Sequence, residues 1–194
     1  LGGDVTRARD ITIAITALGT LDGRRPVLRS GARPGDAVAI RGRLGWAAAG
    51  LAVLGRGFRS PRVVVEAHRV PRVSYGAGAV AARAGATSMI DISDGLLSDL
   101  GHVAQASGVL IDLRQDAFDV AEPLQAVAAA TGSDPYTLLF TGGDDHALAA
   151  TFPAAATVPD GWYVVGNVAA ADHDHSGVVV DGKVWESSAG FDHF

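Results

Sequence analysis

The sequence predicts a layered α+β domain, and three observations lead to this fold class. Short segments with the period-two alternation of strands occur beside segments whose apolar residues recur at helical spacing. These segments do not follow a strict strand–helix–strand order, which argues against a doubly wound sheet. The 194 residues are 48% hydrophobic and 19% charged, as in a well-ordered chain with one substantial core or one domain plus part of another.

The elements follow from the pattern in chain order. Isoleucines alternate with small or hydroxyl-bearing residues over 10–21, which predicts a half-buried strand. The basic Gly/Pro-rich stretch 29–36 is typical of a connector between domains. Short apolar runs between turns predict strands over 37–40, 87–90, 109–113, 147–152 and 162–168. Helical spacing, with Gly or Pro at the ends, predicts helices over 45–54, 62–70, 78–83, 123–130 and 135–140, and another after Gly95. The Asp181-Gly182 pair predicts a hairpin over 178–185.

Composition excludes several classes of function. A net charge of −5 leaves no basic patch for nucleic acid or an anionic membrane, and no stretch is apolar enough to span a bilayer. Without cysteine there is no disulfide or thiolate chemistry, and no signal peptide is visible, so we expect a cytoplasmic protein. Because the chain starts at Leu1 inside a glycine-rich motif, we also expect a fragment.

The stretch 91–102 is the centre of the functional prediction. Asp91, Ser93 and Asp94 lie where a buried strand meets a helix, and Ser93 or Asp94 is predicted to cap that helix. Three carboxylates within nine residues, the third being Asp99, repel each other unless a cation lies among them. Hard oxygens in such a cluster suit Mg²⁺. A helix cap with a solvated polar face is the simpler interpretation of this stretch alone.

Two further glycine turns carry acids, at Gly2-Gly3-Asp4 and at Gly142-Gly143-Asp144-Asp145. Glycines allow a backbone to approach a ligand closely, and neighbouring acids can hold a cation, although each motif alone is more often a turn. Arg29 and Arg33 flank another glycine turn and could bind a phosphate or lie in a solvated linker. The sequence has neither a P-loop nor a protein-kinase H-R-D motif.

Taken together and in this order, these motifs resemble the thiamine-monophosphate kinases of the aminoimidazole-ribonucleotide-synthetase-like superfamily. The motifs are G-G-D-V-T-R at 2–7, R-S-G-A-R-P-G-D at 29–36, D-I-S-D-G-L-L-S-D-L-G-H at 91–102, G-G-D-D at 142–145 and G-F-D-H-F at 190–194. The resemblance implies a PurM-like C-terminal domain, a mixed sheet covered by helices, over residues 33–194. Residues 1–32 would be a remnant of the N-terminal domain that binds ATP and Mg²⁺.

The activity that the resemblance implies is phosphorylation of thiamine monophosphate to thiamine diphosphate by ATP, through direct Mg²⁺-assisted phosphoryl transfer. Such a transfer depends on charge neutralisation and positioning more than on a covalent nucleophile. By resemblance, Mg²⁺ would be held by Asp4, Asp91 and Asp94. ATP would be bound by Gly3, Asp4, Arg29 and Ser93, and thiamine phosphate by Asp144 and Phe191.

Two features depart from the family pattern. Asp144 stands where the family usually has Glu, which shortens the reach by one methylene. The family's earlier N-terminal segment, with metal and substrate contacts and the homodimer interface, has no counterpart here, so we expect the chain alone to be weakly active or inactive. The alternatives are another ATP-using member, such as an aminoimidazole ribonucleotide or selenophosphate synthetase, or a non-catalytic nucleotide-binding domain.

Overall fold

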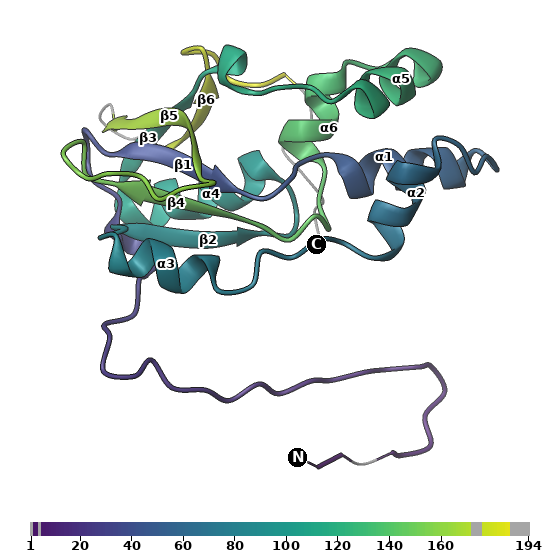
Figure 1. Cartoon of the computed structure of the whole chain (residues 1–194), viewed down its shortest axis with the longest axis horizontal. Helices are drawn as coiled ribbons and strands as arrows, with labels where there is room; N and C mark the ends of the chain where they lie inside the picture. Colours follow the sequence, from purple (N-terminus) through teal and green to yellow (C-terminus); the bar gives the residue numbers. More distant parts are fainter. Residues whose placement is uncertain (1, 4, 172–175, 187–194) are drawn as a thin grey trace.

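The computed structural model describes residues 2–3, 5–171 and 176–186. Residues 5–28 form no helix or strand and run along the outside of a body made by the rest of the chain (Figure 1). The strands are β1 (Ala37–Arg41), β2 (Ser88–Ile92), β3 (Val109–Leu113), β4 (Ala147–Phe152), β5 (Tyr163–Ala170) and β6 (Gly177–Val180). The helices are α1 (Trp46–Gly55), α2 (Arg62–Arg69), α3 (Ala77–Arg83), α4 (Leu96–Ser107), α5 (Glu122–Thr131) and α6 (Pro135–Thr141), with short 3-10 turns η1 (Arg29–Gly31) and η2 (Gln115–Ala117).

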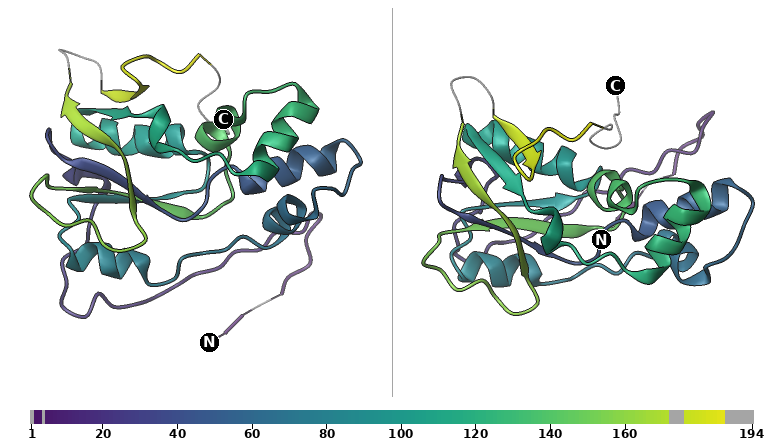
Figure 2. Two further views of the ribbon diagram at one scale, coloured as in Figure 1. Left: turned by 45° about the horizontal axis from the view of Figure 1, so that its top comes forward. Right: turned by 90° about the horizontal axis from the view of Figure 1, so that it is seen from above.

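The six strands form one mixed sheet in the order β2-β4-β1-β5-β3-β6. Every neighbouring pair is antiparallel except β3 and β6, which are parallel. Helices cover the sheet: α4 packs against β2, β3 and β6, whereas α3 contacts β4. The remaining helices α1, α2, α5 and α6 gather beyond one end of the sheet (Figures 1 and 2). The α+β prediction, with a mixed sheet covered by helices, is therefore confirmed.

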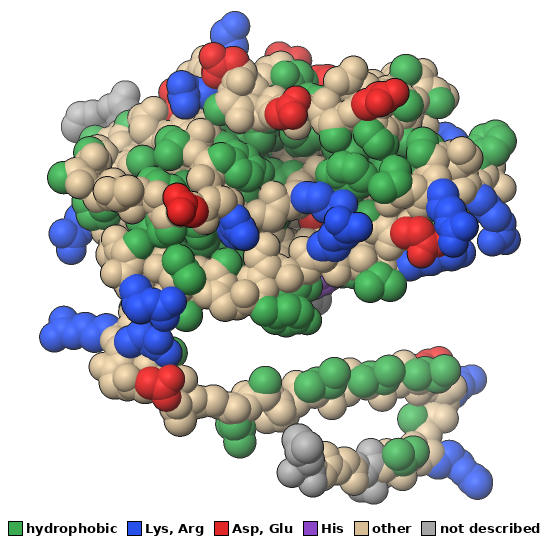
Figure 3. Space-filling view, viewed as in Figure 1, with side chains coloured by type: hydrophobic (Ala, Val, Ile, Leu, Met, Phe, Trp, Pro, Cys, Tyr) green, Lys and Arg blue, Asp and Glu red, His purple; other side chains and the backbone are tan. Residues whose placement is uncertain are grey.

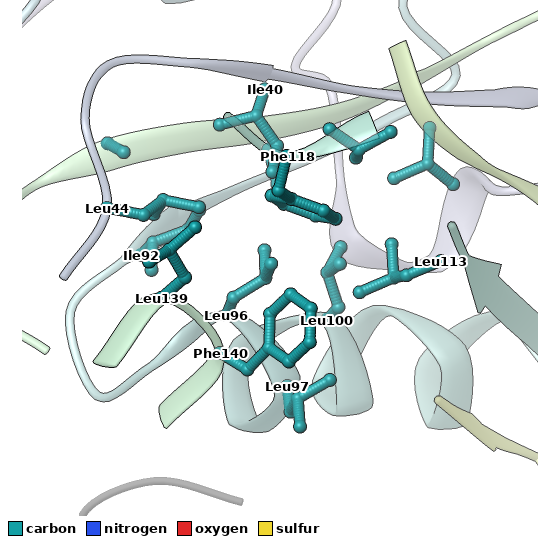
Figure 4. Packing of buried hydrophobic residues seen from close by; sticks show 14 of the residues in the cluster. Ile40, Leu44, Ile92, Leu96, Leu97, Leu100, Leu113, Phe118, Leu139 and Phe140 are labelled. Carbon is teal, nitrogen blue, oxygen red and sulfur yellow. The ribbon is translucent and has the colours of Figure 1, made fainter. Parts of the chain in front are cut away.

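Alternation along the central strands divides the core between the two faces of the sheet. On β1, Val38 and Ile40 belong to the larger apolar cluster, while Ala39 belongs to a smaller one with Phe152 and Trp162. This is the period-two pattern expected of a strand buried on both faces. In the larger cluster, leucines of α4 lie around Phe140 of α6 (Figure 4). This packing holds α4, which follows the loop at 91–95, and α6, which precedes the loop at 142–145.

The predicted strand over residues 10–21 is wrong for this structure. Ile11, Ile13 and Ile15 are 95%, 80% and 88% exposed, and the segment pairs with no strand in the described part of the chain. A half-buried strand needs a neighbour for its N–H and C=O groups and an apolar surface for one face. The described residues provide neither a neighbouring strand nor an apolar surface for this segment.

The predicted hairpin over 178–185 is confirmed only in its turn. Asp181 and Gly182 have φ angles of 49° and 73°, as a tight turn with two left-handed residues requires. The return is limited to a single bridge between Val180 and Lys183, and β6 finds its main partner in β3. Among the described residues, no helix is both long and apolar enough to cross a membrane.

Candidate functional site

Asp91 lies at the end of strand β2 with its side chain facing outward. Ile90 and Ile92 on either side are buried, because side chains alternate across a strand. The strand pairs with β4, where Asp91 stands opposite Leu148. Ser93 and Asp94 follow directly and are half-buried, so the predicted junction between strand and helix is confirmed.

The predicted cap of α4 is wrong, and the structure shows a different arrangement. The N-cap residue is Gly95, with φ 136°, and it makes no side-chain cap bond. Instead Asp99, in the first turn of the helix, reaches back to the loop. Its Oδ2 accepts hydrogen bonds from the backbone N–H groups of Ser93, Asp94 and Gly95 at 2.9, 3.0 and 3.2 Å. Asp99 is 3% exposed, and burial raises its pKa although these N–H groups lower it.

The loop after α6 lies directly against this loop. The backbone N–H of Asp144 donates to the carbonyl of Ser93 at 2.8 Å. A Cβ atom on Gly143 would lie 2.3 Å from the same carbonyl oxygen, and one on Gly95 would lie 2.8 Å from the carbonyl oxygen of Thr141. Only glycine permits this approach. The structure thus brings the motifs at 91–95 and 142–145 together, as the sequence alone could not show.

Asp145 is buried and caps α1 from far away in the chain. Its carboxylate oxygens accept the backbone N–H groups of Trp46 at 3.0 Å and Ala47 at 2.9 Å. Burial raises the pKa of Asp145 to about 6, against the lowering effect of the N–H groups and of the Arg43 charge. Of the two acids in this loop, Asp145 is therefore a structural link, whereas Asp144 beside it is exposed.

The two residues that flank Asp145 adopt an unusual backbone conformation. Asp144 and His146 have φ angles of 63° and 52°, in the left-handed region that side chains other than Gly rarely occupy. Such outliers persist where surrounding contacts hold them, often at binding sites. His146 and Asp91 line one cavity of about 580 Å³, whose far wall is the segment 71–78.

Carboxylate side chains at the site can bind a metal ion that in turn contacts a ligand. Nowhere in the described ranges do three or more His, Asp or Glu side chains gather as a metal-binding group. Asp91, near the end of β2, and Asp94, on the loop before α4, remain as two acids three residues apart. Mg²⁺ usually takes only one or two carboxylates and completes its shell with water and phosphate oxygens, so this donor set fits that ion.

Not every predicted site residue joins this group. Arg29 lies on η1, and its carbonyl accepts the hydroxyl of Ser107 at the C-terminal end of α4. The twelve residues of α4 span about 18 Å, so Arg29 is at the opposite end of the helix from Ser93. Gly3 is exposed in the N-terminal segment. Asp4 and Phe191 lie outside the described residues.

A second cavity, of about 440 Å³, lies between β5, η2 and α1. Its walls include the rings of Trp46, Phe118 and Tyr163, and the Arg43 guanidinium lies 4.5 Å from the centre of the Trp46 ring. Burial, and to a smaller extent the charge of Asp145, raises the pKa of Tyr163 to about 12. Figure 3 shows that hydrophobic side chains gather on one face of the molecule, with Lys or Arg side chains beside them. None of the predicted site residues that the structure describes lines this cavity.

Sequence reasoning missed the contributions of Asp99, Asp145 and His146. Asp99 was grouped with the possible metal ligands because a buried and an exposed carboxylate look the same in a sequence. Its place in the first turn of a helix was a usable signal for capping. Asp145 had no such signal, because the Ala47 N–H group that it accepts is 98 residues away in the sequence. His146 had none either, because its place in a cavity wall appears only in the folded structure.

Comparison with known proteins agrees with the fold. Residues 33–179 match the family described as AIR synthase related protein, C-terminal domain, and the chain belongs to this family. Within it the chain is similar to thiamine-monophosphate kinases. It is 45% identical to the enzyme of Mycobacterium tuberculosis over 195 aligned residues, which are 100% of this chain and 57% of the relative. The Corynebacterium glutamicum enzyme is 38% identical, with 100% of this chain and 60% of the relative covered.

A solved structure supports the same relationship. The chain resembles AaThiL complexed with AMPPCP and TMP, with a TM-score of 0.76 and 32% identity. The match covers 87% of this chain and 54% of that one. The chain thus spans little more than half the length of the relatives that it matches.

Proposed function

We propose that this chain carries the C-terminal part of an enzyme that transfers the γ-phosphoryl group of ATP to thiamine monophosphate, giving thiamine diphosphate. The observation that carries the proposal is the direct contact between the loops at 91–95 and 142–145, sealed by the hydrogen bond from Asp144 to Ser93. These loops hold the motifs by which the chain resembles thiamine-monophosphate kinases, and its 45% identity to one of them supports the same activity.

Asp91 and Asp94 would hold Mg²⁺ in this proposal, together with Asp4. The ion would neutralise phosphate charge and align the two phosphates for an in-line transfer. Asp91 faces outward from β2 beside the 580 Å³ cavity, and Asp94 follows three residues later at the start of α4. Their role is to present carboxylate oxygens from a rigid loop. None of these residues needs to form a covalent intermediate.

Ser93 would contact ATP next to the metal, with Gly3, Asp4 and Arg29 as further ATP contacts. For Arg29 this role requires ATP phosphates to lie near the far end of α4 or a change in the position of η1. Asp144 would contact the thiamine moiety, since it is exposed on a strained loop beside Ser93. Phe191 would lie against the cationic ring, where an aromatic face is favourable.

The organisation of the longer enzyme is part of the same proposal. Residues 33–194 would form the C-terminal domain, and residues 1–32 would belong to an N-terminal ATP-binding domain through which two subunits pair. The exposed isoleucines of 10–21 support this, because the described residues of the rest of the chain leave them uncovered. We expect the chain on its own to be weakly active or inactive. A cytoplasmic location stays a prediction.

The direct test is an assay with ATP, Mg²⁺ and thiamine monophosphate, followed by chromatography for thiamine diphosphate. We would assay the chain itself and a chimera in which it replaces the 57% of the Mycobacterium tuberculosis relative that it matches. Thiamine diphosphate formed by the chimera, with thiamine itself not accepted, is the expected result. A folded chimera that binds ATP without forming product would favour a non-catalytic nucleotide-binding role.

The metal assignment is tested in the same chimera with Asp91→Asn and Asp94→Asn. Each should lower kcat by roughly a hundredfold or more, because metal stabilisation of the transition state is worth several kcal/mol. Asp116→Asn, an exposed aspartate on η2, is the control for loss of a charge. Turnover close to that of the unchanged chimera at saturating Mg²⁺ would refute the assignment.

A further inference from the structure

The start of α4 has the features of an anion site that a side chain of its own helix already fills. Three successive N–H groups, from Ser93, Asp94 and Gly95, converge on one oxygen of Asp99. Successive N–H groups turned toward one point form a concave nest that attracts anions. The positive end of the helix dipole adds to that attraction. Because the carboxylate of Asp99 is buried in the nest, no external anion can use these three donors.

The filled nest changes which ion the loop can accept on its outer side. In a P-loop, backbone N–H groups hold phosphate oxygens directly. Here the same donors are turned inward to Asp99, and its negative charge offsets the positive end of α4. The side chains available to an ion at this place are then the exposed carboxylate of Asp91 on the adjoining strand and the half-buried Asp94 on the loop, rather than backbone N–H groups. A cation is favoured there and a bare phosphate is not.

We propose that Asp99 determines the ion preference of this end of α4: it makes the loop accept a divalent cation and keeps phosphate oxygens away from the backbone N–H groups. The inference rests on the proposed function, in which Mg²⁺ at Asp91 and Asp94 links the loop to the phosphates. Asp99 is a positioning residue and not a ligand, because its Oδ2 is occupied by three backbone donors.

Two substitutions separate the acceptor from the charge. Asp99→Asn keeps an oxygen that can accept the three N–H groups but removes the negative charge. Asp99→Ala removes both and leaves the nest open. Leu100→Ala is the control for destabilisation of the same helix, because Leu100 is buried in the core and its apolar side chain does not bond the N–H groups of the loop. Asp116→Ala is the control for loss of a carboxylate elsewhere on the surface.

Three measurements on the whole chain report the effect without requiring catalysis. Amide exchange of residues 93–95 by NMR follows the nest, electron paramagnetic resonance follows binding of Mn²⁺ as a probe for Mg²⁺, and calorimetry follows metal-free inorganic pyrophosphate. In Asp99→Ala, loop exchange should rise, Mn²⁺ affinity should fall and pyrophosphate affinity should rise, each by about tenfold or more. In Asp99→Asn, loop protection should persist, Mn²⁺ should bind more weakly and pyrophosphate should not gain affinity.

The proposal is overturned if Asp99→Ala keeps wild-type loop protection, or if it gains no pyrophosphate affinity beyond that of the Leu100→Ala and Asp116→Ala controls. Failure of the proposed function looks different. In that case the wild-type chain and the chimera bind no Mn²⁺ at Asp91 and Asp94, while Asp99→Ala still opens the nest to pyrophosphate. That outcome supports the exclusion of phosphate by Asp99 and overturns the magnesium assignment together with the part of this inference that concerns cation binding.

Discussion

Asp145 is a single carboxylate that joins distant parts of the chain, and its contribution to the free energy of unfolding depends on pH. It ties the loop after α6 to the N-terminus of α1 through the N–H groups of Trp46 and Ala47. It does so while 6% exposed, so its ionised form loses most of its hydration. The hydrogen bonds offset only part of that loss, which leaves the pKa near 6.

This raised pKa leads to a stability prediction with a definite sign. Between the unfolded value of 3.8 and the folded value of about 6, the folded protein binds more protons than the unfolded chain. The contribution of Asp145 to stability is therefore full below the lower value and is lost as pH rises through 6. From pH 7 to pH 5 the free energy of unfolding should rise by about 1 kcal/mol more in the wild type than in Asp145→Asn.

Urea unfolding of both proteins at pH 5, 6 and 7 provides the measurement. Asn is the suitable replacement because it keeps a carbonyl acceptor for α1 but does not titrate. Equal pH dependence of the two proteins would show that Asp145 is ionised at the same pH in the folded and unfolded states.

At the scale of elements, close glycine contacts bring the two site loops together. Gly143 has room for no side chain, since a Cβ atom would lie 2.3 Å from the carbonyl oxygen of Ser93. Gly101, in α4, has nothing within 4 Å of the same position. Substitution by alanine is therefore expected to change the free energy of unfolding in opposite directions at Gly143 and Gly101.

Gly143→Ala should lower the free energy of unfolding by about 1–3 kcal/mol, because the loops must separate to admit the methyl group. Gly101→Ala should raise it by about 0.5–1 kcal/mol, because alanine loses less backbone entropy in a helix. Thermal and urea unfolding followed by circular dichroism measure both. A neutral Gly143→Ala would mean that the contact between the loops at 91–95 and 142–145 is not tight.

At the scale of the whole molecule, the body of the fold begins near Leu28. The carbonyl of Leu28 accepts the N–H of Met89, and Asp36, which is buried, accepts the hydroxyl of Thr87 at 2.6 Å. Between Val5 and Leu21, the large apolar side chains of the segment are more than half exposed. The connector predicted over 29–36 is accordingly part of the body, because η1 packs on α4.

Removal of residues 1–27 should leave the melting temperature within about 4 °C of that of the whole chain, which corresponds to 1 kcal/mol or less. Removal of residues 1–36 should lower it by much more, because the bonds of Ala32 to Ser107 and of Asp36 to Thr87 are lost. Scanning calorimetry of the two shortened chains provides the test. A large loss on removal of 1–27 would contradict the exposure of that segment.

Local patterns predicted much of the fold correctly. The strands at 109–113 and 147–152 and the junction at 91–96 follow from short apolar runs, glycines and helical spacing, all of which act over a few residues. The same patterns failed for residues 10–21. Alternation states which face of a strand would be buried, but whether a neighbouring strand exists to bury it is not a local property.

The fold class, the family motifs and the placement of Asp91, Ser93 and Asp94 between a strand and a helix could be predicted from local patterns, because each depends on residues close together in the chain. The folded structure was needed to show that Asp99 and Asp145 are buried links, that Asp144 meets Ser93, and that Arg29 lies at the far end of α4. Burial and hydrogen bonding depend on segments that are distant in sequence. The same aspartate can therefore hold an ion or support a loop, according to what folds against it.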